Sequence, residues 1–255
     1  MVRPKTPEEI QKIRQAGRIV ALALDAVEQA AVPGISTREL DTVAERVIRS
    51  LGAEPAFKGQ RGARSREPFP GTICASVNDE VVHGVPGKRK LVAGDLLSVD
   101  VGARWEGYIG DGARSFGVGP VAPHVRLLLD VCREALIRAI ARLHVGVRVS
   151  DISGTVEDYV VSHGMSVVRD LVGHGVGREL WEEPQVPNFR SSSSDDPELP
   201  AGSVIAIEPM ICAGDWRVRV DSNGWTVRTV DGSFSAHFEH TVAVTPSGAV
   251  ILTLP

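Results

Sequence analysis

Cysteine is scarce in this sequence, and its few copies form no pattern. The 255 residues include three cysteines, at positions 74, 132 and 212, and no two of them have the C-x-x-C spacing of a thiolate zinc site. A metal site built only of thiolates is therefore excluded. Three cysteines without a pairing pattern are typical of a reducing compartment, and we expect a cytoplasmic protein.

An excess of positive charge and a long apolar run are also missing. The formal net charge is −4, so the sequence has no broad basic surface for DNA. The apolar stretch that starts at Ile19 is interrupted by Asp25, and the first residues lead directly into a capped helix. We therefore expect neither a membrane span nor an export signal. At this length we expect a monomer with one domain over residues 1–255, with internal halves of roughly 1–120 and 121–255.

Capping signals and apolar periodicity predict the secondary structure. Thr6 precedes a proline and two glutamates, and residues 36–39, S-T-R-E, form a capping box. These signals predict two helices that end near Ala31 and Gly52. Residues 191–200, S-S-S-S-D-D-P-E-L-P, are expected to be a solvated loop. The other expected elements are strands over 72–118, helices over 123–143 and 150–163, and strands from there to the end.

An internal repeat relates the two halves of the chain. Residues 33–52 match residues 145–164 at a constant offset of 112 positions. Residues 93–100, A-G-D-L-L-S-V-D, match residues 201–208, A-G-S-V-I-A-I-E, at an offset of 108 positions, so Asp100 and Glu208 are counterparts. A chain of two similar halves is expected to bring such acids together where the halves meet.

Two aspartates lie in a predicted β-hairpin at residues 96–112. Its apolar runs flank the polar segment R-W-E-G, and residues an odd number of positions apart can face each other directly across a hairpin. Asp100 and Asp111 are therefore expected to be opposed on one face of a sheet. Two such carboxylates repel each other and are costly to bury, which favours a divalent cation between them. In the alternative interpretation, Asp111 is only a turn residue and Asp100 a half-exposed strand residue.

Further acids and a histidine complete an oxygen-rich set of side chains. Glu239 opens an apolar strand pattern, and glycines on both sides of His174 allow its imidazole to approach another group closely. Strand alternation puts His237 on the same face as Glu239 and His240 on the opposite face. Two aspartates, two glutamates and one histidine suit a pair of divalent ions such as manganese, iron, cobalt or zinc.

These motifs occur in a characteristic order over nearly the whole chain. V-D-V-G and G-D-G are followed by G-H-G-V-G-R, I-E-P-M and F-E-H-T, and in this order they resemble the type I methionine aminopeptidases. The resemblance implies the α+β pita-bread fold, in which two pseudo-symmetric halves surround a curved antiparallel sheet with helices outside. It also implies two divalent metal ions, with the acids at positions 111 and 239 bridging both. The implied ligands are Asp100, Asp111, His174, Glu208 and Glu239.

The resemblance also assigns residues to catalysis and substrate binding. It implies that Glu208 is the general base and that His83 contacts the substrate near the scissile amide. The residues implied for the pocket of the methionine side chain are Phe69, Cys74 and Trp225.

Three features depart from the family pattern. Trp181 stands where the family has a second substrate-contacting histidine, and an indole donates one hydrogen bond but does not titrate. Residues 58–68 are longer and more basic than the family's loop beside the pocket, and we interpret them as a solvated loop, with a contact to substrate or ribosome as the alternative. His237 replaces a glutamine of many relatives, which suggests a hydrogen bond to a ligand carboxylate.

The function implied by the resemblance is the removal of N-terminal methionine. The enzyme would be a metal-dependent aminopeptidase that acts on peptides and nascent proteins whose second residue is small. One alternative is a pita-bread peptidase with shifted specificity, such as a proline-directed one, which the change at Trp181 keeps open. Another is a catalytically weak paralogue that binds partners, and the presence of all five implied ligands weighs against it.

Overall fold

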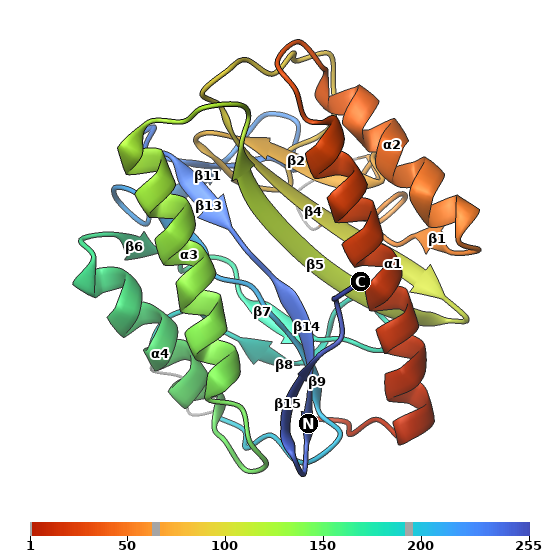
Figure 1. Ribbon diagram of the computed structural model, residues 1–255. Helices are drawn as coiled ribbons and strands as arrows, with labels where there is room; N and C mark the ends of the chain where they lie inside the picture. The colour runs from red at the N-terminus through yellow and green to blue at the C-terminus, as the bar shows by residue number, and fades with distance from the viewer. Residues whose placement is uncertain (1, 63–66, 192–195) are drawn as a thin grey trace.

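Two pairs of helices cover one side of the protein (Figure 1). The computed structural model describes residues 2–62, 67–191 and 196–255. Helix α1 (Pro7–Ala30) packs on α2 (Thr37–Ser50), and α3 (Pro123–Ala141) packs on α4 (Val149–Ser162). All four helices lie within one or two residues of the predicted bounds. The capping boxes of α1 and α2 are formed as predicted, by Thr6 with Glu9 and by Ser36 with Glu39.

Antiparallel strands lie beneath the helices. The strands of the first half are β1 (Glu54–Pro55), β2 (Ile73–Val77), β3 (Glu80–Val82), β4 (Leu96–Trp105) and β5 (Tyr108–Gly117). Those of the second half are β6 (Ser166–Val167), β7 (Gly173–Gly175), β8 (Glu182–Val186), β9 (Val204–Ile207), β10 (Met210–Cys212), β11 (Val218–Val220), β12 (Val227–Thr229), β13 (Ser235–His237), β14 (His240–Thr245) and β15 (Gly248–Ile251).

In the described part of the chain these strands form four small sheets. The first-half sheet has the order β1-β4-β2, with β5 also paired to β4, and the second-half sheet has the order β15-β14-β9-β7-β8. Two three-stranded sheets, β13-β10-β6 and β11-β12-β3, complete the α+β architecture.

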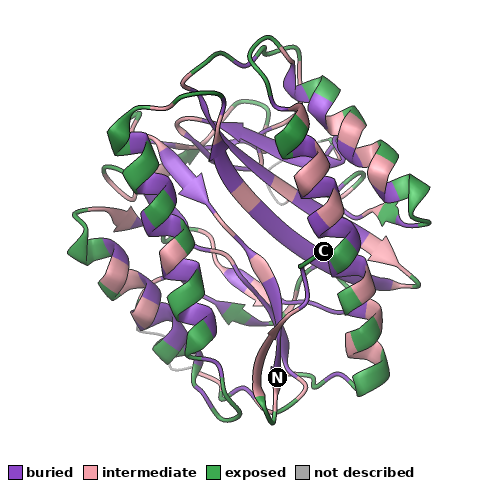
Figure 2. Ribbon diagram, in the orientation of Figure 1, coloured by how far each residue is buried: buried purple, intermediate pink, exposed green. Residues whose placement is uncertain are grey.

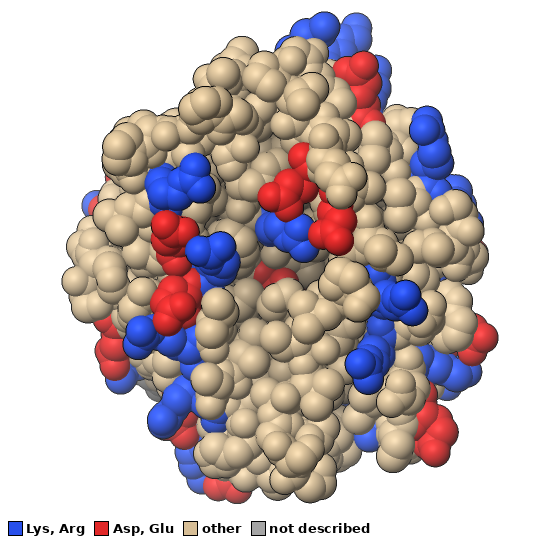
Figure 3. All heavy atoms as spheres, viewed as in Figure 1, with Lys and Arg blue, Asp and Glu red and all other residues tan. Residues whose placement is uncertain are grey.

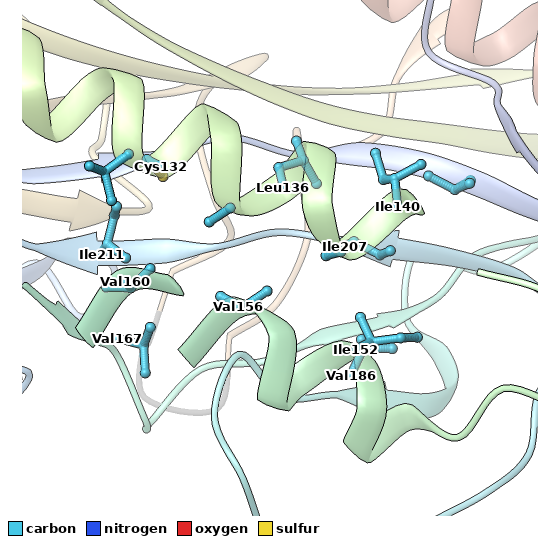
Figure 4. Packing of buried hydrophobic residues seen from close by; sticks show 14 of the residues in the cluster. Cys132, Leu136, Ile140, Ile152, Val156, Val160, Val167, Val186, Ile207 and Ile211 are labelled. Atoms are coloured by element: carbon cyan, nitrogen blue, oxygen red, sulfur yellow. The ribbon is translucent and has the colours of Figure 1, made fainter. Parts of the chain in front are cut away.

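The core lies between the helices and the strands. Each helix turns a buried stripe inward and an exposed one outward, as Figure 2 shows. In the second half, Cys132 and Leu136 of α3 and Ile152 of α4 meet Ile207 and Ile211 of the strands (Figure 4). Because this apolar layer fills one face of the sheets, polar side chains on the opposite face are free to form a site.

Backbones approach closely where α1 crosses β5. A side chain at Gly110 would place its Cβ 2.4 Å from the backbone nitrogen of Gly17, so neither position has room for one. This close crossing holds β5 against α1. It therefore fixes the position of the strand that carries Asp111.

The two halves are joined by hydrogen bonds between β5 and the start of β14. The Asp111 N–H donates to Thr241 Oγ1 at 3.1 Å, and the Thr241 hydroxyl donates to the Asp111 carbonyl at 2.7 Å. The Glu239 N–H donates to the Ala113 carbonyl at 2.9 Å. This seam brings together one acid from each half, Asp111 and Glu239.

The surface agrees with the near-neutral composition. Figure 3 shows basic and acidic side chains mixed over the helix-covered face, with no large area of one sign. Among the described residues, no helix combines the length and the apolar character needed to cross a membrane.

Candidate metal centre

The two aspartates of the hairpin share a face but are not directly opposed. Glu106 and Gly107 form the turn with φ of 46° and 81°, so the loop has two residues and both have positive φ. This turn pairs Asp100 with Ala113 and Asp111 with Gly102. The expected direct opposition is therefore wrong by two residues in the register, and the aspartates are diagonal neighbours on one face.

The interpretation of Asp111 as a turn residue is also wrong. Asp111 lies inside β5, and its exposed fraction is 4%. Asp100 keeps partial exposure, but its Oδ1 atom is buried. Both carboxyl groups therefore belong to the interior face of the sheet.

The second half contributes three more side chains to the same place. His174 lies in β7, Glu208 follows β9, and Glu239 lies between β13 and β14. His174 Nε2 is 3.4 Å from Glu208 Oε1 and 3.8 Å from Asp111 Oδ2. Ligand atoms of Asp111, His174 and Glu239 all lie within 4.8 Å of one another. The implied ligands thus come from both halves and meet at the seam.

Burial opposes ionisation of this cluster. Desolvation raises the pKa of Asp100, Glu208 and Glu239 well above the usual range, and the neighbouring carboxylates raise it further. Desolvation also raises the pKa of Asp111, to about 7, and lowers that of His174. Four desolvated acids beside a neutral imidazole form an arrangement that a cation would stabilise.

Unpaired atoms support the same conclusion. Within the described residues, the oxygens Asp100 Oδ1, Asp111 Oδ1 and Glu239 Oε1 are buried without a hydrogen-bond partner. Such atoms cost about 1–3 kcal/mol each unless something satisfies them. Oxygen donors with one imidazole nitrogen match the ligand preferences of hard and borderline divalent ions. The residues therefore fit divalent metal ions.

We predict that metal binding raises the thermal midpoint more at pH 8 than at pH 6. The pKa of Asp111 is raised in the folded protein, so the metal-free fold loses stability as pH rises through about 7. A carboxylate bound to metal does not carry this penalty. From the ionisation of Asp111 alone, we expect metal binding to raise the thermal midpoint by about 4 °C more at pH 8 than at pH 6. Calorimetry with and without a chelator measures it, and an equal gain at both pH values would contradict the predicted role of burial.

The five candidate ligands line a cavity of about 900 Å³. The residues implied for the methionine pocket, Phe69, Cys74 and Trp225, all line it. The rings of Phe69 and Trp225 meet edge to face, with centroids 5.1 Å apart. Cys74 pairs with Asp100 in the register of β2 and β4, so its side chain is on the face of the metal centre. The cavity therefore has an apolar part next to the acids.

His83 and Trp181 also line the cavity, in different environments. His83 has a φ of 57°, and burial lowers the pKa of its imidazole to about 4, so the ring is neutral. Trp181 is exposed over 53% of its surface, at the mouth. The side chain of Trp181 is thus more exposed to solvent than that of His83.

His237, the last residue of β13, lies beside Glu208. Its Nε2 is 3.6 Å from Glu208 Oε2, just outside hydrogen-bonding distance, and it has no partner in the described part of the chain. Burial lowers the pKa of this imidazole to about 3. His240 points the other way, and its Nδ1 is 2.8 Å from Thr253 Oγ1.

The basic segment at residues 58–68 borders the cavity only in part. Lys58 turns away and forms an ion pair with Glu45 of α2 at 2.9 Å. Gln60 and Gly62 line the cavity, and Gly62 lies against the ring of Trp225. Residues 63–66, like residues 192–195 of the predicted solvated loop, lie outside the described residues.

Two contacts of the site were not visible in the sequence. Thr241 fixes the backbone of Asp111, and the only signal for it was its place after F-E-H. Lys5 forms an ion pair of 2.7 Å with Glu182 in the cavity wall, and its side chain is only 3% exposed. No sequence pattern predicts a contact across 177 positions.

Comparison with known proteins identifies the family. The chain matches metallopeptidase family M24 over residues 11–246. It is 47% identical to methionine aminopeptidase 1 of Bacillus subtilis over 253 residues, which are 99% of either chain. The crystal structure of methionine aminopeptidase from Thermotoga maritima superposes with a TM-score of 0.95 at 45% identity, with full coverage of both chains.

A more distant neighbour shares the fold. Prolidase from Pyrococcus furiosus superposes with a TM-score of 0.78 at 25% identity, over 99% of this chain and 65% of that one. The full-length matches at much higher identity are with methionine aminopeptidases. From the extent and identity of these matches, the chain belongs to metallopeptidase family M24, with the pita-bread fold, and within it to the methionine aminopeptidases.

Proposed function

We propose that this chain hydrolyses the peptide bond after an N-terminal methionine, with preference for a small second residue. The single observation that carries the proposal is that the five candidate ligand side chains and the apolar pocket residues line one cavity. The relatives of similar length bear the name of this activity. The substrates are then the N-termini of peptides and nascent proteins in the cytoplasm.

The proposed cofactor is a pair of divalent ions, of manganese, iron, cobalt or zinc. Asp111 and Glu239, one acid from each half, would hold these ions at the seam. The other three ligands, Asp100, His174 and Glu208, complete the set. When bound, such ions polarise the substrate carbonyl and lower the pKa of a water molecule.

The proposed mechanism uses two side chains for proton transfer and orientation. Glu208 accepts the proton of the attacking water at a carboxylate oxygen and passes it to the leaving amine. His83 is neutral because burial lowers the pKa of its imidazole. One of its ring nitrogens therefore carries a proton and donates a hydrogen bond to the substrate amide, and the other can accept a hydrogen bond.

The pocket accounts for the specificity for methionine. Phe69, Cys74 and Trp225 offer an aromatic pair and a thiol that contact a thioether favourably. Burial raises the pKa of the Cys74 thiol well above its usual range, so this wall carries no charge. A lysine or aspartate in the first position would lose its hydration there without gaining a partner.

We predict that Met-Ala-Ser is hydrolysed at least about 100-fold faster than Lys-Ala-Ser or Asp-Ala-Ser, as kcat/KM. Each peptide is incubated with the protein loaded with manganese, iron, cobalt or zinc, and the free amino acid is quantified. Met-Pro-Ser serves as the matched test for proline-directed specificity. Preferred release of lysine or aspartate would overturn the proposal, and preferred cleavage of Met-Pro-Ser would favour the proline-directed alternative.

A further inference from the structure

Trp181 is an aromatic side chain left open at the cavity mouth. Its exposed fraction is 53%, and every other tryptophan, phenylalanine and tyrosine in the described part of the chain is buried or half-buried. The apolar surface of an exposed indole is in contact with water in the free protein. It becomes buried only when a partner covers it, and this burial favours binding. Tryptophan is also among the residues that contribute most to binding energy at interfaces.

Contacts on both sides hold Trp181 in place. Leu180 is 3% exposed and packs in the cluster that contains Tyr108 and Ile109. Glu182 accepts hydrogen bonds from the buried Lys5 ammonium at 2.7 Å and from the Arg178 N–H at 2.9 Å. The indole thus stands on a segment fixed at either end. A ligand that covers a preorganised ring loses little conformational entropy on binding.

Two valines belong to the same cavity lining as Trp181. Val218 and Val220 of β11 are half-buried and line the same cavity as Trp181. Strand β11 lies at the edge of the order β11-β12-β3. Three exposed charged residues also line the cavity, Asp170, Glu183 and Arg219, and Arg219 is paired with Asp221 at 2.8 Å. The mouth therefore combines apolar walls with acidic groups.

The substrate chain is the occupant that this geometry favours. The cavity of about 900 Å³ lies near the upper end of the range of about 300–1,000 Å³ for ligand sites, so it has room for residues beyond the first. In the proposed function, the first side chain fills the pocket at Phe69 and the second residue lies at the metal centre. The third residue is then the first one that reaches the mouth, about 3.3–3.6 Å further along the chain per residue.

We propose that Trp181, with Val218 and Val220, binds an apolar side chain at the third position of the substrate. This inference rests on the proposed function and adds a second determinant of specificity to it. Apolar third residues are favoured because they cover the indole and the two valines. Acidic third residues are disfavoured because Asp170 and Glu183 repel them.

The test compares Met-Ala-Phe-Ser with Met-Ala-Gly-Ser and Met-Ala-Asp-Ser on the metal-loaded enzyme. We expect kcat/KM about 10-fold higher for the phenylalanine peptide than for the glycine peptide, mainly through KM, and lowest for the aspartate peptide. Trp181→Ala reduces the phenylalanine-to-glycine ratio to below about 2, whereas Trp181→Phe keeps most of it. The matched control is Val161→Ala, which truncates an exposed apolar residue of α4 that is not part of the cavity lining.

A binding measurement keeps the inference separate from the activity. Titration calorimetry of the metal-depleted protein with the same peptides gives the ratio of Kd values without turnover. A ratio near 1 in the wild-type protein, or a ratio that survives both Trp181→Ala and Val218→Ser, would overturn the inference while methionine release still supports the proposed function. Preferential binding of the phenylalanine peptide without methionine release would instead retain the subsite and overturn the proposed function.

Discussion

Replacement of Asp111 by asparagine is expected to reduce kcat/KM for Met-Ala-Ser by more than about 100-fold. Loss of a group that only supports a metal ligand lowers metal affinity or activity by about 10–100-fold, and Asp111 is proposed to be a ligand itself. Asparagine keeps the shape of the side chain but offers one weakly basic oxygen. Elemental analysis of the purified Asp111→Asn protein is expected to find fewer than two ions per chain.

The metal-free stability of the same variant separates a functional from a structural role. Desolvation raises the pKa of Asp111, so the asparagine removes an unfavourable buried charge at pH 8. We expect the metal-free midpoint to stay equal or rise. Asp158→Asn is the control, because this exposed acid pairs with Arg190 far from the cavity lining. Full activity of Asp111→Asn, or a midpoint well below wild type, would argue against a metal ligand.

Glu208→Gln is expected to reduce kcat by about 10²–10⁴-fold, the usual contribution of a positioned general base. Glutamine preserves the length and one ligand oxygen, but it does not take up a proton at neutral pH. Because the substrate pocket is untouched, KM is expected to change by less than about 5-fold, which corresponds to about 1 kcal/mol. Steady-state kinetics on Met-Ala-Ser measure both constants.

The control for this change is Glu134→Gln on α3, an exposed acid that pairs with Arg138. Metal content is measured on both proteins, so that loss of a ligand is distinguished from loss of a base. A Glu208→Gln protein that retains both its ions and a kcat within about 5-fold of wild type would exclude proton transfer by Glu208. Proton transfer would then have to be sought at His83 or His237.

The hairpin shows where prediction from the sequence stops. Apolar runs around R-W-E-G identify two strands and place Asp100 and Asp111 on one face, because side chains alternate along a strand. The register depends on which residues make the turn. Glu106 and Gly107 both adopt positive φ and form the two-residue loop, so Asp100 pairs with Ala113, two positions beyond the expected partner Asp111.

Local signals determined the helices and the chemistry of the site. The capping boxes at Thr6 and Ser36 each act within one helical turn. Four consecutive residues are therefore enough to predict where α1 and α2 begin. The repeat that relates Asp100 to Glu208, with the motifs around His174 and Glu239, specified an oxygen-rich metal set. These features depend on the residues themselves and on their spacing.

Only the tertiary structure decided how these groups are arranged and supported. The contact of Asp111 with Thr241 spans 130 positions, and that of Lys5 with Glu182 spans 177. Trp181 is open at the cavity mouth, although its sequence surroundings do not distinguish it from a buried tryptophan. The physical reason is that burial, desolvation and contacts between distant segments depend on how the whole chain packs, whereas capping and strand alternation depend on neighbours in the sequence.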